Sequence, residues 1–312
     1  MSEKWNIGID IGGTKINIGI VSDRGCVLDS VIIPSDYKDQ HELFVDNVYN
    51  KTQELLQRNN MTLESISFIG IGVPGTIEIK TGFVNYCPNL FWVDVPIGKI
   101  IEQKFKRKIS MGQDVRLAAL AELLFGAGIG FTDILCVVVG TGIGCGIIIG
   151  GKIFSGAMNT AGEIGHMIFE KNGRQCTCGT KGCLERYASG TGIIERALEV
   201  LDEESFDGRS RKSETVFELA QEGNEIALKL IDDCVSDLAV GITNSVDLLS
   251  PQAVIIGGGL CEHEELFFNP LKKYVVDHGY FSWTKRNELQ ICKAKLGSDA
   301  AMIGAAMLFR GM

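Results

Sequence analysis

The sequence predicts an α/β protein with two domains, and three observations support this fold class. Predicted strands alternate with predicted helices, which is the pattern of α/β proteins. The 312 residues are more than one small core needs. A glycine-rich turn between two apolar strands occurs twice, at residues 10–15 and 140–144. This repetition indicates an internal duplication, with coincidence as the alternative because short glycine-containing hairpins are common.

The composition excludes several classes of protein. A net charge of −9 argues against nucleic acid or an anionic membrane surface as the main partner. Residues 134–151 carry no charge, but six of these 18 residues are glycine, so we expect two strands and a turn rather than a membrane helix. The first ten residues have no apolar run of signal-peptide length, which predicts a cytoplasmic protein. The ten cysteines do not form a disulfide framework, since most are scattered through apolar or turn-like contexts.

The N-terminal part of the chain is expected to open with a β-meander. The predicted elements follow from apolar periodicity and turn residues. In order, they are three strands within residues 6–33, a helix over 41–59, a strand over 66–73, a helix near 97–105 and a short strand ending at 113. We assign residues 1–114 to an N-terminal domain, which the C-terminal helix at 298–312 would complete.

The remainder, residues 115–297, is assigned to a second α/β domain. Its predicted elements rest on the same signals. They are a helix over 117–125, two strands within 134–149, a helix over 225–249, a strand over 253–256, a helix near 262–277 and a strand near 289–294. A last helix over 300–308 is expected to be capped by Ser298 or Asp299.

A cluster of one histidine and three cysteines is the strongest chemical signal in the chain. His166, Cys176, Cys178 and Cys183 lie within 18 residues and supply four nitrogen and sulfur ligands, enough for a tetrahedral zinc site. Because all four ligands come from the protein, no position is left for a reactive water, and the zinc is predicted to be structural. Two carboxylates, on Glu163 and Glu185, flank the ligands and could hold a compound rich in hydroxyl groups.

Three glycine turns and two aspartates suggest a second site. Residues 12–14, 140–142 and 257–259 each stand at the end of an apolar strand, where bare backbone can approach a phosphate; taken singly, each could be only a tight turn. Asp10 could hold Mg²⁺ through water, or it could merely accept N–H bonds of its turn. Asp114 could be a general base on rigid elements or a helix N-cap.

These residues together resemble the ROK family (repressors, open reading frames and sugar kinases). The resemblance runs nearly from end to end, and its most specific part is Gly162-Glu-Ile-Gly-His166 combined with the cysteine cluster. The other matching stretches are Asp10-Ile-Gly-Gly-Thr-Lys15, Gly72-Val-Pro-Gly75, Pro88-Asn-Leu90 with Trp92, Asp114 with Ala118-Ala-Leu-Ala-Glu122, Gly140-Thr-Gly142 and Gly257-Gly-Gly259.

The resemblance implies an actin-like ATPase fold of two domains with a cleft between them, and a kinase that uses ATP and Mg²⁺ to phosphorylate a hexose at its 6-hydroxyl. Asp114 would be the catalytic base. The implied ATP and Mg²⁺ residues are Asp10, Gly12, Gly13, Thr14, Lys15, Gly140, Thr141, Gly142, Gly257, Gly258 and Gly259. The implied sugar contacts are Glu163, His166 and Glu185, with Gly75, Asn89, Gln113 and Asp114 nearby. The implied zinc ligands are His166, Cys176, Cys178 and Cys183, and a homodimer or homotetramer is expected.

One departure from the family bears on the sugar. The family usually has Asn immediately before the catalytic aspartate, and this chain has Gln113, whose amide lies one methylene further out. Since that Asn reads the 3- and 4-hydroxyl side of the sugar in the family, we hypothesise that the preferred hexose differs from glucose there, allose being one candidate. An N-acetylhexosamine or fructose kinase stays open.

A non-catalytic, sugar-responsive regulator of the same family is the alternative from another class. A repressor would need a DNA-binding helix-turn-helix ahead of the first strand, and about six residues precede Ile7. A protein that only binds sugar would not need both Asp10 and Asp114. We therefore expect an enzyme.

Overall fold

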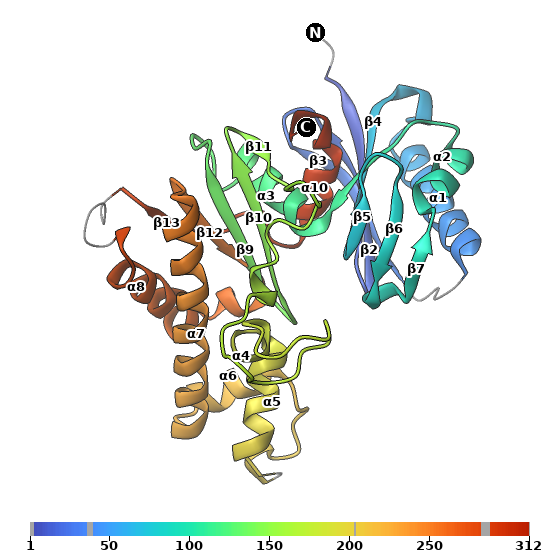
Figure 1. The fold of residues 1–312 in the computed structure, drawn as a ribbon. Helices are drawn as coiled ribbons and strands as arrows, with labels where there is room; N and C mark the ends of the chain where they lie inside the picture. Colours follow the sequence, from blue (N-terminus) through green and yellow to red (C-terminus); the bar gives the residue numbers. More distant parts are fainter. Residues whose placement is uncertain (1–2, 36–39, 203, 282–287, 312) are drawn as a thin grey trace. The chain divides into compact units, whose positions relative to one another are not determined.

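A computed structural model describes the chain apart from residues 1–2, 36–39, 203, 282–287 and 312 (Figure 1). The chain forms two compact units. The first unit comprises residues 1–136, 146–161 and 295–312, and the second unit comprises residues 137–145 and 162–294. The first unit extends past residue 114 because α3 (Asp114–Phe125) packs against α10 (Ala300–Ala306). Where independently folding domains begin and end stays a prediction.

The first unit is built on a five-stranded sheet with the strand order β3-β2-β1-β4-β8. The strands are β1 (Trp5–Ile11), β2 (Lys15–Ser22), β3 (Val27–Pro34), β4 (Ile66–Val73) and β8 (Ser110–Gln113). Strand β1 pairs antiparallel with β2 and parallel with β4, and β4 pairs parallel with β8. Three strands therefore bring their carboxyl ends to one edge, the edge at which α/β proteins place their ligands.

Alternation along β1 separates the two faces of this sheet. Ile7 and Ile9 are fully buried in a core that includes Phe44 of α1 (His41–Arg58). Gly8 faces α10, and a Cβ built on it would lie only 2.0 Å from the carbonyl oxygen of Met302. The absence of a side chain at Gly8 thus lets the backbone of α10 lie directly on the sheet.

Apart from β11 (Lys152–Ile153) and parts of β9 (Ile134–Val139) and β10 (Ile143–Ile149), which belong to the second sheet described below, the remaining elements of the first unit are short. They are the 3₁₀ turns Leu63–Ser65 and Pro88–Leu90, a three-stranded sheet of β5 (Thr76–Glu78), β6 (Phe83–Cys87) and β7 (Trp92–Val95), helix α2 (Ile97–Phe105), the 3₁₀ turn Gly297–Asp299 and helix α11 (Leu308–Gly311).

A second five-stranded sheet has the order β11-β10-β9-β12-β13. Its strands are β9 (Ile134–Val139), β10 (Ile143–Ile149), β11 (Lys152–Ile153), β12 (Ala253–Gly257) and β13 (Gln290–Lys293). In both sheets the first three strands lie in reverse order and are followed by two later strands. This is the relationship that an internal duplication predicts. The chain enters the second unit within β9 and leaves it within β10.

Helices make up much of the second unit. They are the 3₁₀ turns Ile164–His166, Glu204–Phe206 and Gly259–Glu262, a π-helical turn at Glu264–Phe268, and α4 (Glu185–Ala188), α5 (Gly190–Val200), α6 (Ser213–Gln221), α7 (Glu225–Leu249) and α8 (Asn269–Asp277). The sequence pattern predicts one apolar face of α7 with Ile226, Leu230, Cys234, Leu238 and Ile242. The last four are buried, but Ile226, in the first turn of the helix, is 47% exposed.

Two predictions of helix structure are wrong in detail. The helix expected near 262–277 is helical from Glu264 onward, but its first turn, Glu264–Phe268, is π-helical and runs directly into α8. Pro270 lies in the first turn of α8, where a missing N–H costs no intrahelical bond. Asp299 does not cap α10 with its side chain; its carboxylate instead accepts from the amide of Asn17 at 2.9 Å. Within the described part of the chain, no helix combines the length and apolar character needed to span a bilayer.

Candidate functional site

Asp10 and Asp114 approach one another at the carboxyl edge of the first sheet. Asp10 is the second-last residue of β1, and Asp114 begins α3 directly after β8. Gly72 of β4 pairs with Asp10, and a Cβ on Gly72 would lie 3.4 Å from Asp10 Oδ1 and 3.7 Å from the Asp114 Cα atom. The nearest neighbour of that Cβ would be Leu117 Cδ1 at 3.1 Å, so Gly72 packs closely on Leu117 and lies beside both aspartates.

The protonation of Asp10 reflects this arrangement. Burial, followed by the negative charge of Asp114, raises the pKa of Asp10 to about 7, and Lys15 acts in the opposite direction. A carboxyl group of this kind is stabilised in its charged form by a divalent cation. Oxygen donors are the ligands that Mg²⁺ prefers, so Asp10 fits a magnesium site in its chemistry.

Asp114 is the first residue of α3 and not its N-cap. The N-cap position belongs to Gln113, which has an extended backbone and makes no side-chain cap bond. The carboxylate of Asp114 accepts the N–H of Val115 at 2.8 Å, which fixes its orientation at the start of the helix. The N-cap alternative for Asp114 is therefore wrong, and a carboxylate held on rigid elements suits a general base.

The first glycine turn lies against Asn89. Gly12 N–H donates to the carbonyl of Lys15 at 2.9 Å, which closes the turn, and Thr14 C=O accepts from Ser35 N–H at 3.2 Å. A Cβ on Gly13 would lie 2.9 Å from the Cβ of Asn89. The structure thus brings this predicted sugar residue to the predicted phosphate turn.

Gly75 follows β4 and has a backbone that only glycine adopts easily. Its φ is +88°, and a Cβ there would lie 2.3 Å from the carbonyl oxygen of Tyr86. Gly75 is therefore needed for the close approach of β6 at this edge, whatever its role toward a ligand.

The four predicted zinc ligands converge in the second unit. One ligand atom from each of His166, Cys176, Cys178 and Cys183 lies within 4.8 Å of the others. His166 Nδ1 is 3.8 Å from Cys176 Sγ, and Cys178 Sγ is 3.6 Å from Cys183 Sγ. Sulfur ligands about 2.3 Å from a tetrahedral zinc are about 3.8 Å apart, so the donor set has the dimensions of a zinc site.

The cysteine side of the cluster is shaped by a tight turn. Gly179 has a φ of +92° and donates to the carbonyl of Cys176 at 3.1 Å, while Cys176 N–H donates to Thr180 at 2.9 Å. Burial and then the neighbouring thiols Cys178 and Cys176 raise the pKa of Cys183 to about 12. The pKa of Cys178 moves the other way: burial acts to raise it, but hydrogen bonds from Thr180 and the neighbouring thiols outweigh burial and lower it to about 7. The cluster thus favours one thiolate and opposes another, and a bound Zn²⁺ would stabilise all of them.

Glu163 and His166 belong to a single 3₁₀ turn. His166 N–H donates to the carbonyl of Glu163 at 3.1 Å, and Glu163 is the N-cap of the turn. Gly165 packs on β10, since a Cβ on it would lie 2.4 Å from the carbonyl oxygen of Ile143. Anchoring His166 to a metal would therefore also fix the backbone that carries Glu163.

The other two glycine turns lie together in the second unit. Gly140 N–H donates to the carbonyl of Gly142 at 3.0 Å. Gly258 has a φ of +98°, and a Cβ on it would lie 2.1 Å from the carbonyl oxygen of Val139. The turn after β12 thus packs on the last residue of β9, immediately before the turn at 140–142.

Glu185 contacts the glycine turn at 140–142. Its Oε2 accepts the N–H of Ile143 at 3.0 Å, and a Cβ on Gly142 would lie 2.3 Å from the same oxygen. We predict from the family resemblance that Glu185 contacts the sugar, and the structure assigns one of its oxygens to the backbone of this turn.

Sequence reasoning missed Arg116 as an organising residue. Its side chain is 2% exposed, and its guanidinium donates to Asn159 Oδ1 at 2.7 Å and to the carbonyls of Asn159 at 3.0 Å and Ala161 at 2.9 Å. The signal was available: an arginine stands two residues after Asp114, at the start of an otherwise apolar helical run. A buried guanidinium of this kind fixes the loop it binds.

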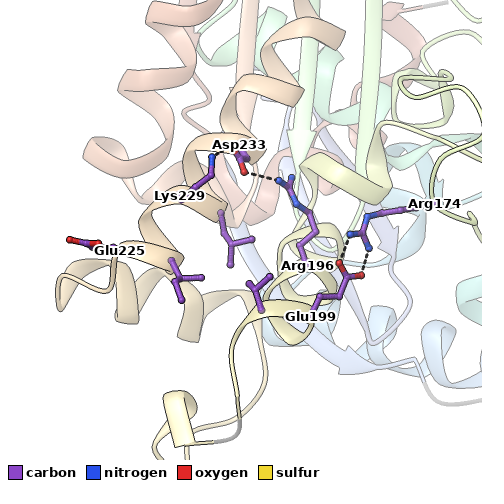
Figure 2. A pocket seen from close by; sticks show the side chains of 9 residues that line it. Arg174, Arg196, Glu199, Glu225, Lys229 and Asp233 are labelled. Atoms are coloured by element: carbon purple, nitrogen blue, oxygen red, sulfur yellow. Dashed lines mark hydrogen bonds and ion pairs between the residues drawn. The ribbon is translucent and has the colours of Figure 1, made fainter.

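A groove of about 580 Å³ opens beside α5 and α7 (Figure 2). Three cations line it, and each has an acidic partner: Arg174 pairs with Glu199 at 2.6 Å, and Arg196 and Lys229 pair with Asp233 at 3.1 and 3.2 Å. The groove contains none of the predicted site residues, and its cations already neutralise acids. It is therefore not the candidate active site.

The predicted residues thus form two groups, one in each unit. The first group, in the first unit, contains Asp10, Gly12, Gly13, Thr14, Lys15, Gly75, Asn89, Gln113 and Asp114. The second group, in the second unit, contains Gly140, Thr141, Gly142, Glu163, His166, Cys176, Cys178, Cys183, Glu185, Gly257, Gly258 and Gly259.

Comparisons with known proteins match the chain to one family model and to both kinases and repressors. The model of the ROK family matches residues 6–312. A glucokinase of Halalkalibacterium halodurans is 32% identical over 319 residues, which cover 99% of this chain and 96% of that protein. A xylose repressor of Caldicellulosiruptor bescii is 29% identical over 316 residues, covering 97% of this chain and 79% of that protein.

A solved structure extends the comparison to the fold. A ROK family glucokinase from Streptomyces griseus, crystallised with glucose and AMPPNP, superimposes with a TM-score of 0.81 at 30% identity, covering 97% of this chain and 98% of that chain. The predicted α/β fold of the actin-like ATPases is confirmed by this likeness. With the family model matched over nearly its whole length, the chain belongs to the ROK family.

Proposed function

We propose that the protein is an ATP- and Mg²⁺-dependent hexose kinase that phosphorylates the sugar at its 6-hydroxyl. The observation that carries the proposal is the approach of Asp10 and Asp114 at the carboxyl edge of the first sheet, where Gly72 lies beside both residues and the charge of Asp114 acts on Asp10. The similarity to a glucokinase over 99% of the chain supports the same activity. Phosphoryl transfer asks a protein mainly to position its reactants and to neutralise charge, which these residues suit.

Asp114 acts in this proposal as the general base. Its carboxylate takes the proton from the sugar hydroxyl as that oxygen attacks the γ-phosphorus of ATP, and the bond from this phosphorus to the β–γ bridging oxygen breaks, so that ADP leaves. The bond from Val115 N–H, at 2.8 Å, holds the carboxylate in a defined orientation. Asp10 would hold the magnesium ion through water, and the bound ion would neutralise charge on the phosphates.

The backbone amides of the glycine turns are proposed to hold ATP. Residues 12–15 and 140–142 would bind the phosphates, and residues 257–259 would lie on the adenosine side. Bare backbone at these turns offers N–H donors without a side chain in the way.

A structural zinc is proposed on His166, Cys176, Cys178 and Cys183. Support comes from the geometry of the cluster, whose ligand atoms lie within 4.8 Å of one another. The zinc would fix Glu163 and His166 as sugar ligands together with Glu185, and Gly75, Asn89 and Gln113 would complete the sugar site.

The activity is tested by measuring ADP release with Mg-ATP and a panel of sugars. The panel contains glucose, allose, mannose, fructose, N-acetylglucosamine and N-acetylmannosamine. We expect a sugar-dependent rate in the wild-type protein and a fall in kcat of about 10²- to 10⁴-fold in Asp114→Asn, because the base is lost. Asp232→Asn, which removes an exposed carboxylate, is the matched control and should leave the rate unchanged.

A non-catalytic, sugar-responsive regulator is the second candidate, favoured by the similarity to a xylose repressor over 97% of this chain. The same panel separates the two candidates. Sugar binding by calorimetry without sugar-dependent ADP release would support the regulator and reject the kinase.

A further inference from the structure

Residues 185–191 make four hydrogen bonds to the glycine turn at residues 140–142 and to Ile143, which follows it. This segment begins two residues after the last predicted metal ligand, Cys183, and runs into the first turn of α5. Both the turn and the segment lie in the second unit. The contacts between them involve three consecutive peptide groups, those after Gly140, Thr141 and Gly142. The segment therefore fixes the orientation of each of these peptide groups.

The start of α5 supplies the donors. Gly190 N–H donates to the carbonyl of Gly140 at 2.8 Å, and Thr191 N–H donates to the carbonyl of Thr141 at 3.2 Å. The hydroxyl of Thr191 donates to the same Thr141 carbonyl at 2.8 Å. The first N–H groups of a helix have no partner within the helix, so α5 satisfies two of them with the glycine turn.

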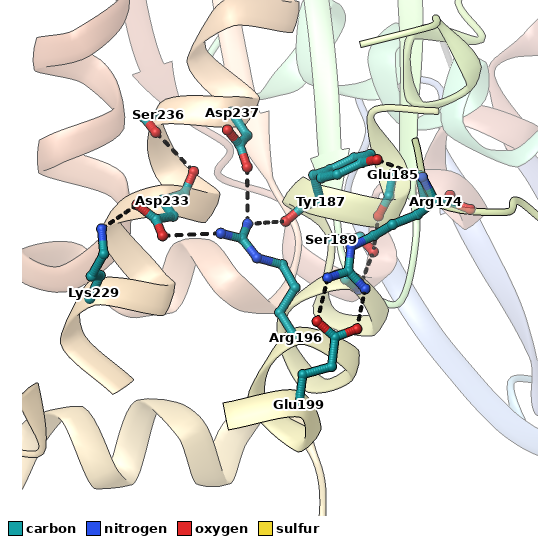
Figure 3. Close-up of polar contacts among 11 residues, drawn as sticks. Arg174, Glu185, Tyr187, Ser189, Arg196, Glu199, Lys229, Asp233, Ser236 and Asp237 are labelled. Carbon is teal, nitrogen blue, oxygen red and sulfur yellow. Dashed lines mark hydrogen bonds and ion pairs between the residues drawn. The ribbon is translucent and has the colours of Figure 1, made fainter. Parts of the chain in front are cut away.

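Glu185 supplies the acceptor on the other side. Its Oε2 accepts Ile143 N–H at 3.0 Å, which fixes the peptide group that joins Gly142 to Ile143. Ser189 links the two ends of the segment, since its hydroxyl donates to the carbonyl of Glu185 at 2.7 Å and accepts Gly192 N–H at 3.1 Å (Figure 3). Ser189 is therefore the N-cap of α5, and it also fixes the backbone carbonyl of Glu185.

The geometry of the peptide bond shows where the N–H groups of Thr141 and Gly142 point. The C=O and N–H of a trans peptide point in opposite directions. Because the carbonyls of Gly140 and Thr141 point toward α5, the N–H groups of Thr141 and Gly142 must point away from it. These two N–H groups are the ones that a phosphate would accept from, so their direction is set by Thr191 and Gly190.

The segment is also tied to the loop that carries the cysteines. Arg186 N–H donates to the carbonyl of Cys183 at 3.0 Å. Arg174, two residues before Cys176, forms a double hydrogen bond of 2.6 Å with Glu199 of α5, and its N–H donates to Tyr187 Oη at 2.7 Å (Figure 3). The conformation of the cysteine loop is thus coupled to α4 and α5 by direct hydrogen bonds.

We propose that residues 185–191 are a clamp that holds the turn at 140–142 in its phosphate-binding conformation, with Thr191 as a positioning residue. The inference rests on the proposed function only in assigning this turn to the phosphates of ATP. It gives residues 185–191, which follow the cysteine cluster, a second role. In the proposed function Glu185 binds the sugar, and here the same segment also orients the backbone that binds ATP.

Two variants of Thr191 test the clamp. Thr191→Val removes the hydroxyl at nearly constant shape, and Thr191→Ser retains it. We expect the KM for Mg-ATP to rise about 2- to 10-fold in Thr191→Val, as the loss of one hydrogen bond predicts, with the KM for the sugar unchanged and near-normal values in Thr191→Ser. Hydrogen exchange of the amides at residues 140–143 should quicken in Thr191→Val alone.

The outcomes separate this inference from the proposed function. An active wild type with an unchanged KM for ATP and unchanged exchange in Thr191→Val would overturn the clamp. If the wild type shows no sugar-dependent ADP release, the kinase proposal fails, and hydrogen exchange alone then decides whether Thr191 holds the turn. Should Thr191→Val not fold, as judged by circular dichroism, Thr191→Ala tests the same hydroxyl with the same two expected results.

Discussion

Folding favours the protonated form of Asp10, whereas binding of a magnesium ion needs its carboxylate form. Its pKa is raised to about 7, first by burial and then by Asp114, so folding favours its protonated form. A carboxyl group whose pKa is higher in the folded than in the unfolded state stabilises the protein fully at low pH. That contribution declines as the pH rises from about 4, the unfolded value, to about 7. Above pH 7 the folded, ligand-free protein carries an unfavourable charge at this position.

Asp10→Asn should therefore stabilise the ligand-free protein at pH 8 while it reduces activity. We expect the free energy of unfolding to rise by about 1–3 kcal/mol at pH 8 and to change little at pH 4, measured by urea denaturation without magnesium. Sugar-dependent ADP release should fall strongly, because the neutral amide cannot hold the cation. A variant as unstable at pH 8 as the wild type would show that Asp10 does not carry this charge conflict.

Gln113 is the residue at which we expect the choice of sugar to be made. It precedes Asp114 and occupies the N-cap of α3 with an extended backbone. The junction of β8 and α3 therefore fixes the position of its Cα atom. Its amide lies one methylene further out than that of the family's usual Asn. A change of this size acts through hydrogen bonds to a hydroxyl, which can discriminate strongly between epimers.

We expect Gln113→Asn to move the preference toward glucose. The ratio of kcat/KM for glucose to that for allose should rise by about 10-fold, because the shorter amide restores the family's usual reach. Gln103→Asn, on the exposed side of α2, is the matched control. Equal or better turnover of glucose than of its 3- and 4-epimers by the wild-type protein would reject the hypothesis.

Among the elements, helix α3 links the candidate base to a loop far along the chain. It begins with Asp114, and two residues later Arg116 donates three hydrogen bonds to Asn159 and Ala161. Asn159 in turn donates to the carbonyl of Ile77 at 2.6 Å. One buried guanidinium therefore orders a loop that would otherwise leave several carbonyls without donors.

Replacing Arg116 should destabilise the fold. We expect Arg116→Met to lower the free energy of unfolding by about 2–4 kcal/mol, since buried carbonyls lose charged donors. Arg116→Lys keeps the positive charge but lacks the several N–H donors of the guanidinium. We expect it to lower the free energy of unfolding by less than Arg116→Met does. Arg24→Met, at an exposed position, is the control, and urea denaturation is the measurement. An equal effect at both positions would contradict the role of Arg116.

The loop that carries the cysteines is the element most dependent on a metal. Its backbone has few regular hydrogen-bonded elements, and its predicted ligands are only a few residues apart. A structural zinc can contribute on the order of 10 kcal/mol to the folding of such a loop.

Cys176→Ser should remove that contribution. We expect the zinc content, measured by atomic absorption, to fall from about one ion per chain to near zero, together with a lower Tm and a faster hydrogen exchange of the loop. Cys26→Ser, which changes an exposed cysteine outside the cluster, should alter none of these. Purified wild-type protein without zinc, yet folded and active, would contradict the structural role.

For the whole molecule, the state of assembly stays a prediction. The family resemblance implies a homodimer or a homotetramer. Size-exclusion chromatography with light scattering should then give two or four times the 33.9 kDa of one chain. A mass equal to one chain across micromolar concentrations would reject both.

Most of the architecture could be predicted from the sequence because it depends on local patterns. The hairpin of β1 and β2, the strand pair around residues 140–142 and the long helix α7 all follow from apolar periodicity and turn residues. The metal ligands could be predicted for the same reason, since one short stretch holds all four. The activity, in contrast, was predicted from the resemblance to a family.

Only the tertiary structure decided which distant residues meet. Asp10 and Asp114 are brought together beside Gly72 by three parallel strands, and no local pattern encodes that pairing. Thr191 and Glu185 contact the turn at 140–142 and the residue after it across 50 and 42 positions of sequence. Sequence by itself determined the elements and the nearby ligands, because propensity and spacing act over a few residues. The structure decided the long-range contacts, because they arise from the packing of whole elements.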